Sequence, residues 1–170
     1  MTDNVRVKST PAPSSKILAY QKDSERFDRS FHYRLVIGKL NYLEKTRPGI
    51  LYATHQCARF SEDPQKIHAK SVRWLAKYLK STRDKGVIMR PNRDKNLEMY
   101  VDADFAGNRK KEEANHRDTA RSRNGYIIMF HGCPLLWKSQ LQSEITLLST
   151  KSEYIGYCMV FVMQSQSWKY

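Results

Sequence analysis

Two aspartates stand one residue apart in "YVDADFAG", the stretch from Tyr100 to Gly107. Because alternate residues of a strand share a face, Asp102 and Asp104 would lie on one side of it, about 6 to 7 Å apart. Acidic residues are depleted in strands, so the pair needs a reason. Two explanations stay open: a polar face turned to water, or a carboxylate site for Mg²⁺.

Glu153 is the acid that would complete such a site, because it lies in a predicted helix that could pack back onto the sheet. Carboxylates converging from a strand and a helix can hold two metal ions, which stabilise the attacking and leaving oxygens of a phosphodiester. Thr150 to Glu153 also fit a capping box, with Glu153 accepting the backbone N–H of Thr150. The spacing alone favours this capping role.

Three helical segments precede the strands. Apolar side chains recur at helical spacing from Tyr33 to Leu43, and again after Pro48. The third helix has the clearest pattern, with Asp63 as its expected N-cap and Pro64 next. These helices are expected to position a set of basic side chains.

Basic residues gather on one part of the third helix. They could follow a phosphate backbone, and a solvated helix face is the alternative. Lys plus Arg total 30 against 17 Asp plus Glu, a net charge of +13, which indicates a polyanionic partner such as nucleic acid. The candidate nucleic-acid-binding residues are Lys66, Lys70, Arg73, Lys77, Lys80, Arg121 and Arg123.

The periodicity falls to two after the third helix. Val87 to Arg90 and Leu97 to Phe105 are strand candidates, and Gly125 to Phe130 pairs with Pro134 to Lys138 in a hairpin through His131 to Cys133. A helix follows near Thr150. We expect an α/β (α+β) chain with three parts: an extended or disordered lead-in at 1–28, a helical part at 29–85 and a sheet-containing part at 86–170.

The cysteine spacing and the lack of long apolar runs exclude several classes of protein. Three widely spaced cysteines form no CxxC pair, so neither a zinc ribbon nor a disulfide framework is expected. No secretory signal pattern and no bilayer-length apolar run is present, so we expect no membrane association and a cytoplasmic or nuclear location.

Several long blocks of the chain, in order, resemble one family. They include "FHYRLVIGKLNYLEKTRPGILYATHQCARFSEDP", "YVDADFAGN", "TARSRNGYIIMFHGCPLLWKSQLQ" and "LLSTKSEYIG". Together they are similar to the C-terminal part of copia-type retrotransposon polyproteins, where a helical tail of the reverse transcriptase precedes a ribonuclease H domain. The resemblance covers about Ser9 to Tyr157.

The resemblance implies an activity and a set of site residues. It implies a ribonuclease H-like sheet whose strands 1 to 3 are antiparallel, with one packed helix, and Mg²⁺-dependent hydrolysis of RNA in RNA–DNA hybrids. Asp102 and Glu153 match the family's metal-binding catalytic acids, and Asp104 matches a further acid of lesser role. No Asp or Glu follows Glu153, so we expect a truncated domain that does not cleave by itself.

The expected partners are RNA–DNA hybrids or duplexes, bound without sequence preference, and the remainder of a reverse transcriptase. The alternative is a non-catalytic module that binds nucleic acid through its basic surface or docks on a polymerase.

Overall fold

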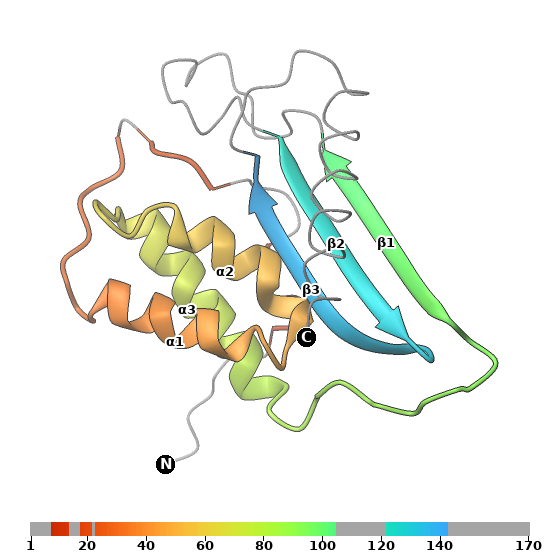
Figure 1. The fold of residues 1–170 in the computed structure, drawn as a ribbon. Coiled ribbons are helices and arrows are strands. Elements are labelled where there is room, and N and C mark those ends of the chain that lie inside the picture. The colour runs from red at the N-terminus through yellow and green to blue at the C-terminus, as the bar shows by residue number, and fades with distance from the viewer. Residues whose placement is uncertain (1–7, 14–17, 22, 105–121, 143–170) are drawn as a thin grey trace. The chain divides into compact units, whose positions relative to one another are not determined.

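A computed structural model describes residues 8–13, 18–21, 23–104 and 122–142. The chain divides into two compact units, Met1–Val87 and Ile88–Tyr170. The first contains three α-helices and the second a three-stranded antiparallel sheet, shown in Figure 1, so the expected α+β class is confirmed. The helix predicted near Thr150 lies outside the described residues. The elements are α1 (Tyr33–Leu43), η1 (Pro48–Ile50), α2 (Leu51–Ala58), α3 (Lys66–Ser81), β1 (Leu97–Asp104), β2 (Arg123–Phe130) and β3 (Cys133–Leu141).

The helical unit is held together by one apolar core. Leu75 of α3 is fully buried, and it shares the core with Ile37 of α1 and Ile50 of η1. The hydroxyl of Tyr33 donates to the carbonyl oxygen of Cys57 at 2.9 Å, which joins α1 to the end of α2. Burial raises the pKa of the Cys57 thiol to about 12, so this cysteine stays an uncharged core residue.

The start of α3 differs from the prediction. Its N-cap is Gln65, not Asp63, and Gln65 forms a capping box with His68. Asp63 instead lies 3.9 Å from the Nε of Arg26 in an exposed ion pair. The backbone N–H of Phe27 bonds the carbonyl of Pro64, so a neighbouring segment holds this stretch outside the helix.

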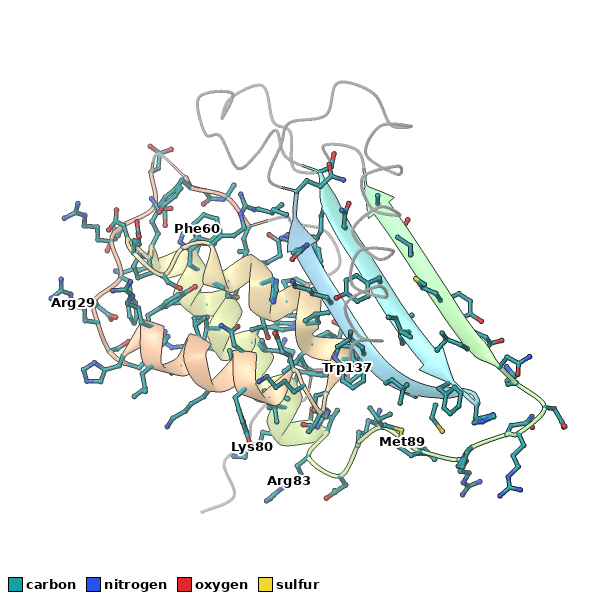
Figure 2. All side chains as sticks on the ribbon, viewed as in Figure 1. Arg29, Phe60, Lys80, Arg83, Met89 and Trp137 are labelled. Atoms are coloured by element: carbon teal, nitrogen blue, oxygen red, sulfur yellow. The ribbon has the colours of Figure 1, made fainter. Side chains whose placement is uncertain are left out.

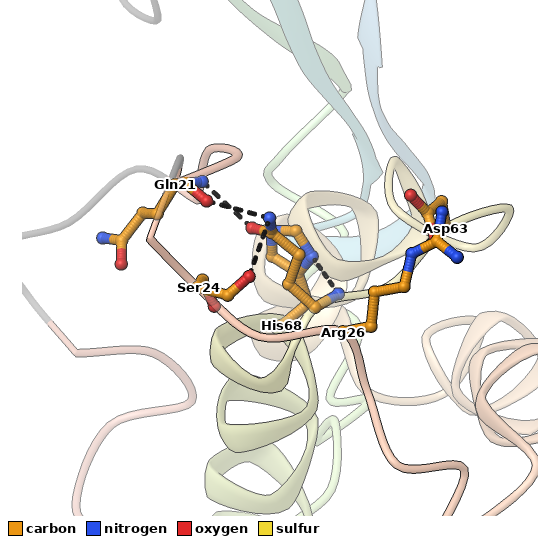
Figure 3. Close-up of polar contacts among 6 residues, drawn as sticks. Gln21, Ser24, Arg26, Asp63 and His68 are labelled. Carbon is orange, nitrogen blue, oxygen red and sulfur yellow. Dashed lines mark hydrogen bonds and ion pairs between the residues drawn. The ribbon is translucent and has the colours of Figure 1, made fainter.

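That neighbouring segment is the described part of the expected lead-in. It has no helix, as expected, but it packs on α3. The side chain of Gln65 accepts from the N–H of Gln21 at 3.0 Å and donates to its carbonyl at 2.9 Å, as drawn in Figure 3. Phe27 belongs to the buried core. The described residues of this segment, 18–21 and 23–28, therefore form part of the packed helical unit.

His68 joins this segment to α3. Its Nδ1 accepts from the N–H of Gln65 at 3.0 Å, so the proton is on Nε2, which donates to the carbonyl of Ala19 at 3.1 Å. The ring is fully buried and stacks on Phe60, with centroids 3.7 Å apart. Burial lowers the pKa of His68, and the nearby charge of Arg59 lowers it further.

Acidification should therefore destabilise the helical unit. The pKa of His68 is lower in the folded chain than its ordinary value of about 6.5, so the unfolded chain binds a proton first. The stabilisation is complete above about pH 6.5 and is lost as the pH falls below it. We expect urea unfolding at about pH 5 to need less denaturant than at about pH 7.5.

A matched pair of variants separates this histidine from other titrating groups. His68→Gln should unfold more easily than the wild type at the higher pH and show a smaller change between the two pH values. His32→Gln, at the exposed N-cap of α1, should keep the full pH change. An equal pH change in His68→Gln and the wild type would show that His68 is not the cause.

The sheet has the order β1-β2-β3 with antiparallel pairs. The β2–β3 hairpin turns through His131 and Gly132, whose φ angles of 50° and 74° are both positive. Two positive φ angles are those of a type I′ turn, which matches the twist of the flanking strands. The predicted hairpin is confirmed, but β3 runs to Leu141 rather than Lys138 because Ser139 and Leu141 pair with Gly125 and Arg123.

The expected strand at Val87 to Arg90 is wrong. These residues are irregular, and Ile88 and Met89 are largely exposed. None of the strand pairs in the described part of the chain involves this stretch. A run of four residues keeps strand geometry only when a neighbour takes up its backbone hydrogen bonds.

Candidate nucleic-acid interface and carboxylate site

Asp102 lies near the C-terminal end of β1 with its side chain exposed, and it is paired with Gly125 of β2. Asp104 is paired with Arg123 in the same ladder. The alternation of β1 follows the predicted pattern, because Met99 and Val101 are partly buried while Tyr100 and Asp102 are exposed.

Asp102 has two cross-strand neighbours in the sheet. Cross-strand partners share a face, so Asp102, Gly125 and Ser139 form one row across the three strands. Gly125 contributes no side chain to this row, and among the described residues a Cβ there would meet only the main-chain oxygens of Asp102 and Lys138, at 4.0 Å. Asp102 is exposed at one end of the row, and Ser139 is buried at the other.

Arg123 lies next to this row and is nearly buried, at 7% exposure. Its Nη1 donates to the hydroxyl of Ser139 at 3.2 Å. Sequence reasoning selected Arg123 as a phosphate contact and did not anticipate its bond to Ser139, for which the sequence carries no local signal. The phosphate contact of Arg123 stays a prediction, and Arg121 lies outside the described residues.

The expected Mg²⁺ site stays a prediction. Glu153 and the side chain of Asp104 lie outside the described part of the chain. Among the residues that the structure describes, no group of three His, Cys, Asp or Glu side chains could hold a metal ion. Asp102 by itself is one carboxylate, and Mg²⁺ is usually held by one or two with further ligands. The described residues alone therefore do not make the metal site.

The basic residues of α3 form one exposed stripe, which we call the α3 stripe: Lys66, Lys70, Arg73, Lys77 and Lys80. Their spacings of four and three residues place them on one side of the helix. At 1.5 Å per residue, the stripe extends about 21 Å along the axis. Figure 2 shows Lys80 projecting at the end of α3, with Arg83 beyond it.

Two members of the α3 stripe have partners in the segment before α1. The Nζ of Lys66 pairs with the carboxylate of Glu25. The Nη2 of Arg73 donates to the hydroxyl of Ser30 at 2.6 Å, and its guanidinium lies 5.5 Å from the ring centroid of Phe31. By contrast, none of the ion pairs among the described residues involves Lys70, Lys77 or Lys80.

A sixth basic side chain lies beside the α3 stripe and was missed from sequence. The Nζ of Lys8 lies 3.6 Å from the ring centroid of Trp74. The indole N–H of Trp74 donates to the carbonyl oxygen of Thr10 at 3.0 Å, and the hydroxyl of Ser81 donates to the carbonyl oxygen of Lys8. Lys8 is 66 positions before Trp74 in the sequence, so no local pattern could have placed it there.

No helix in the described ranges combines the length and the apolar content needed to cross a bilayer.

Comparison with known proteins finds relatives over most of the chain. It is 32% identical over 147 residues to the retrovirus-related Pol polyprotein from transposon RE1 of Arabidopsis thaliana, covering 86% of this chain and 9% of the relative. It is 35% identical over 125 residues to the corresponding polyprotein from transposon TNT 1-94 of Nicotiana tabacum, covering 73% and 9%. The chain thus spans about a tenth of these relatives' length.

A third relative is close to this chain in length. The secreted RxLR effector protein 161 of Plasmopara viticola is 30% identical over 125 residues, which cover 73% of this chain and 82% of the relative. No family model matches the chain, and no solved structure matches it. The sequence matches show that this chain is homologous, at about 30% identity over most of its length, to copia-type retrotransposon Pol polyproteins.

Proposed function

We infer that this chain is a segment of a Pol polyprotein whose activity is hydrolysis of the RNA strand in RNA–DNA hybrids. By itself the chain would bind nucleic acid through the α3 stripe without cleaving it. The observation that supports the hydrolase assignment is Asp102, an exposed carboxylate in the acid pair of a strand in an antiparallel sheet.

Different residues would bind the metal ion and the nucleic acid. Asp102, with Asp104 and Glu153, would hold Mg²⁺, which supplies charge stabilisation to the attacking and leaving oxygens of a phosphodiester. The lack of a side chain at Gly125, the cross-strand partner of Asp102, would let the backbone of a nucleic acid approach that carboxylate. The α3 stripe would bind phosphates through charge alone, so it would not distinguish sequences.

A hybrid-cleavage assay tests the catalytic part. We expect the 170-residue chain to leave a labelled RNA–DNA hybrid intact with Mg²⁺ or Mn²⁺, because the two acids that match the family's catalytic pair, Asp102 and Glu153, are too few to hold two Mg²⁺ ions. The matched variants are Asp102→Asn and Glu98→Gln, which change carboxylates on the same face of β1. If the wild type and Glu98→Gln cleave the hybrid and Asp102→Asn does not, the hydrolase assignment is supported. The expected inactivity of the isolated chain is then refuted.

The second candidate is a non-catalytic nucleic-acid-binding module. It is favoured by the α3 stripe, whose five side chains are exposed and lie in the helical unit rather than in the sheet. Under this alternative, adding the remainder of a reverse transcriptase would not produce cleavage that depends on Asp102. Under the first candidate, it would.

A further inference from the structure

The first cation of the α3 stripe, Lys66, is already paired with an acid of the same chain. Glu25 pairs with Lys66, although both side chains are exposed, at 74% and 46%. Bonding to Lys66 lowers the pKa of Glu25, and the same pair raises the pKa of Lys66. Both groups are therefore charged near neutral pH, and each partly neutralises the other.

Asp28 lies in the same segment and faces the same cations. Its Oδ1 accepts the backbone N–H of Ser30 at 3.1 Å, and the hydroxyl of Ser30 accepts from Arg73. The bonds from Ser30 lower the pKa of Asp28, and the charges of Arg73 and Lys66 lower it further. Glu25 and Asp28 thus present two carboxylates to the part of α3 that contains Lys66 and Arg73.

The segment that carries these acids is held in place by other contacts. The backbone N–H of Lys66 donates to the carbonyl oxygen of Glu25 at 3.0 Å. The backbone N–H of Phe27 donates to the carbonyl oxygen of Pro64 at 3.1 Å. Phe27 is in the core. The backbone of the segment is therefore fixed beside α3, while the side chain of Glu25 is in solvent and can turn away from Lys66.

We propose that Glu25, supported by Asp28, is an internal competitor of nucleic-acid phosphates for the α3 stripe. Binding would begin on Lys70, Lys77 and Lys80, and a phosphate would then displace the carboxylate of Glu25 from Lys66. This proposal rests on the proposed nucleic-acid binding, and it adds a control on the strength of that binding. The competition is modest because an exposed ion pair holds its partners weakly.

The test measures binding of the full chain to a labelled RNA–DNA hybrid across a range of salt concentrations. Glu25→Gln should raise the affinity about two- to fivefold at low salt, and the slope of log K against log salt should become steeper by up to about 0.9, the value for one more phosphate. Glu62→Gln is the matched control: it removes the same charge from an exposed site just before α3.

A third variant distinguishes local competition from a change in net charge. Lys66→Gln should weaken binding less in the wild type than in the Glu25→Gln background, because in the wild type a phosphate must first displace Glu25 from Lys66. Equal effects of Glu25→Gln and Glu62→Gln would refute the competition. Equal effects of Lys66→Gln in the two backgrounds would refute it as well.

The outcomes also separate this proposal from the function on which it rests. If the wild type binds the hybrid and Glu25→Gln binds it equally well, only the competition is refuted. No binding of the hybrid at low salt, or binding of anionic phosphatidylserine vesicles in its place, would refute the proposed nucleic-acid binding and the competition together.

Discussion

The affinity of the full chain for an RNA–DNA hybrid is expected to fall about 300- to 1,000-fold when monovalent salt rises from about 50 to 200 mM. Each phosphate that a protein cation neutralises contributes about −0.9 to the slope of log K against log salt. The five side chains of the α3 stripe are exposed and able to make such contacts. We therefore expect a slope of about −4 to −5, measured by fluorescence anisotropy of a labelled hybrid.

A matched set of substitutions assigns this slope to α3. Changing Lys70, Lys77 and Lys80 together to Gln should reduce its magnitude by about 3, because three phosphate contacts are lost. Changing Lys39, Lys45 and Lys85 to Gln removes the same charge from exposed positions outside α3 and should have a much smaller effect. Affinity that does not depend on salt, or equal slopes for the two triple variants, would contradict the assignment.

Leu75→Ala is expected to lower the free energy of unfolding of the helical unit by about 3 to 5 kcal/mol. Leu75 has no exposed surface and lies in the core that joins the helices, so truncation removes apolar contacts and leaves a cavity. Urea unfolding followed by circular dichroism measures the change. A loss that large removes much of the stability typical of a small domain.

Leu35→Ala is the control for this prediction. Leu35 lies on α1 and is 57% exposed, so the same chemical change should cost less than about 1 kcal/mol. Similar losses for the two variants would mean that Leu75 is not a core residue, and that the helices do not pack as described.

The sequence by itself determined the elements whose signals are local. Helical spacing predicted α1 from Tyr33 to Leu43, which is its observed extent. Alternation predicted β1 and the exposed side on which Asp102 lies. The His131-Gly132 turn could be found because residues tolerant of positive φ between two apolar runs favour a hairpin. Homology to Pol polyproteins could also be predicted from sequence, because the blocks that resemble them stand in order along the chain.

The tertiary structure alone decided which distant residues meet. Asp63 had the better local pattern for an N-cap, but Gln65 has that position because it also bonds Gln21, 44 residues away. Arg123 bonds Ser139, a residue of β3 that pairs with Gly125, and only the pairing of the two strands brings these side chains together. Val87 to Arg90 has the composition of a strand and no described partner strand.

The same distinction applies to the candidate interface. Periodicity placed five cations on one side of α3, because a helix repeats every 3.6 residues. That Glu25 neutralises Lys66 and that Lys8 lies over Trp74 depend on a segment folded back across α3. Contacts between residues 41 and 66 positions apart arise from packing, which brings distant parts of the chain together and leaves no periodic trace in the sequence.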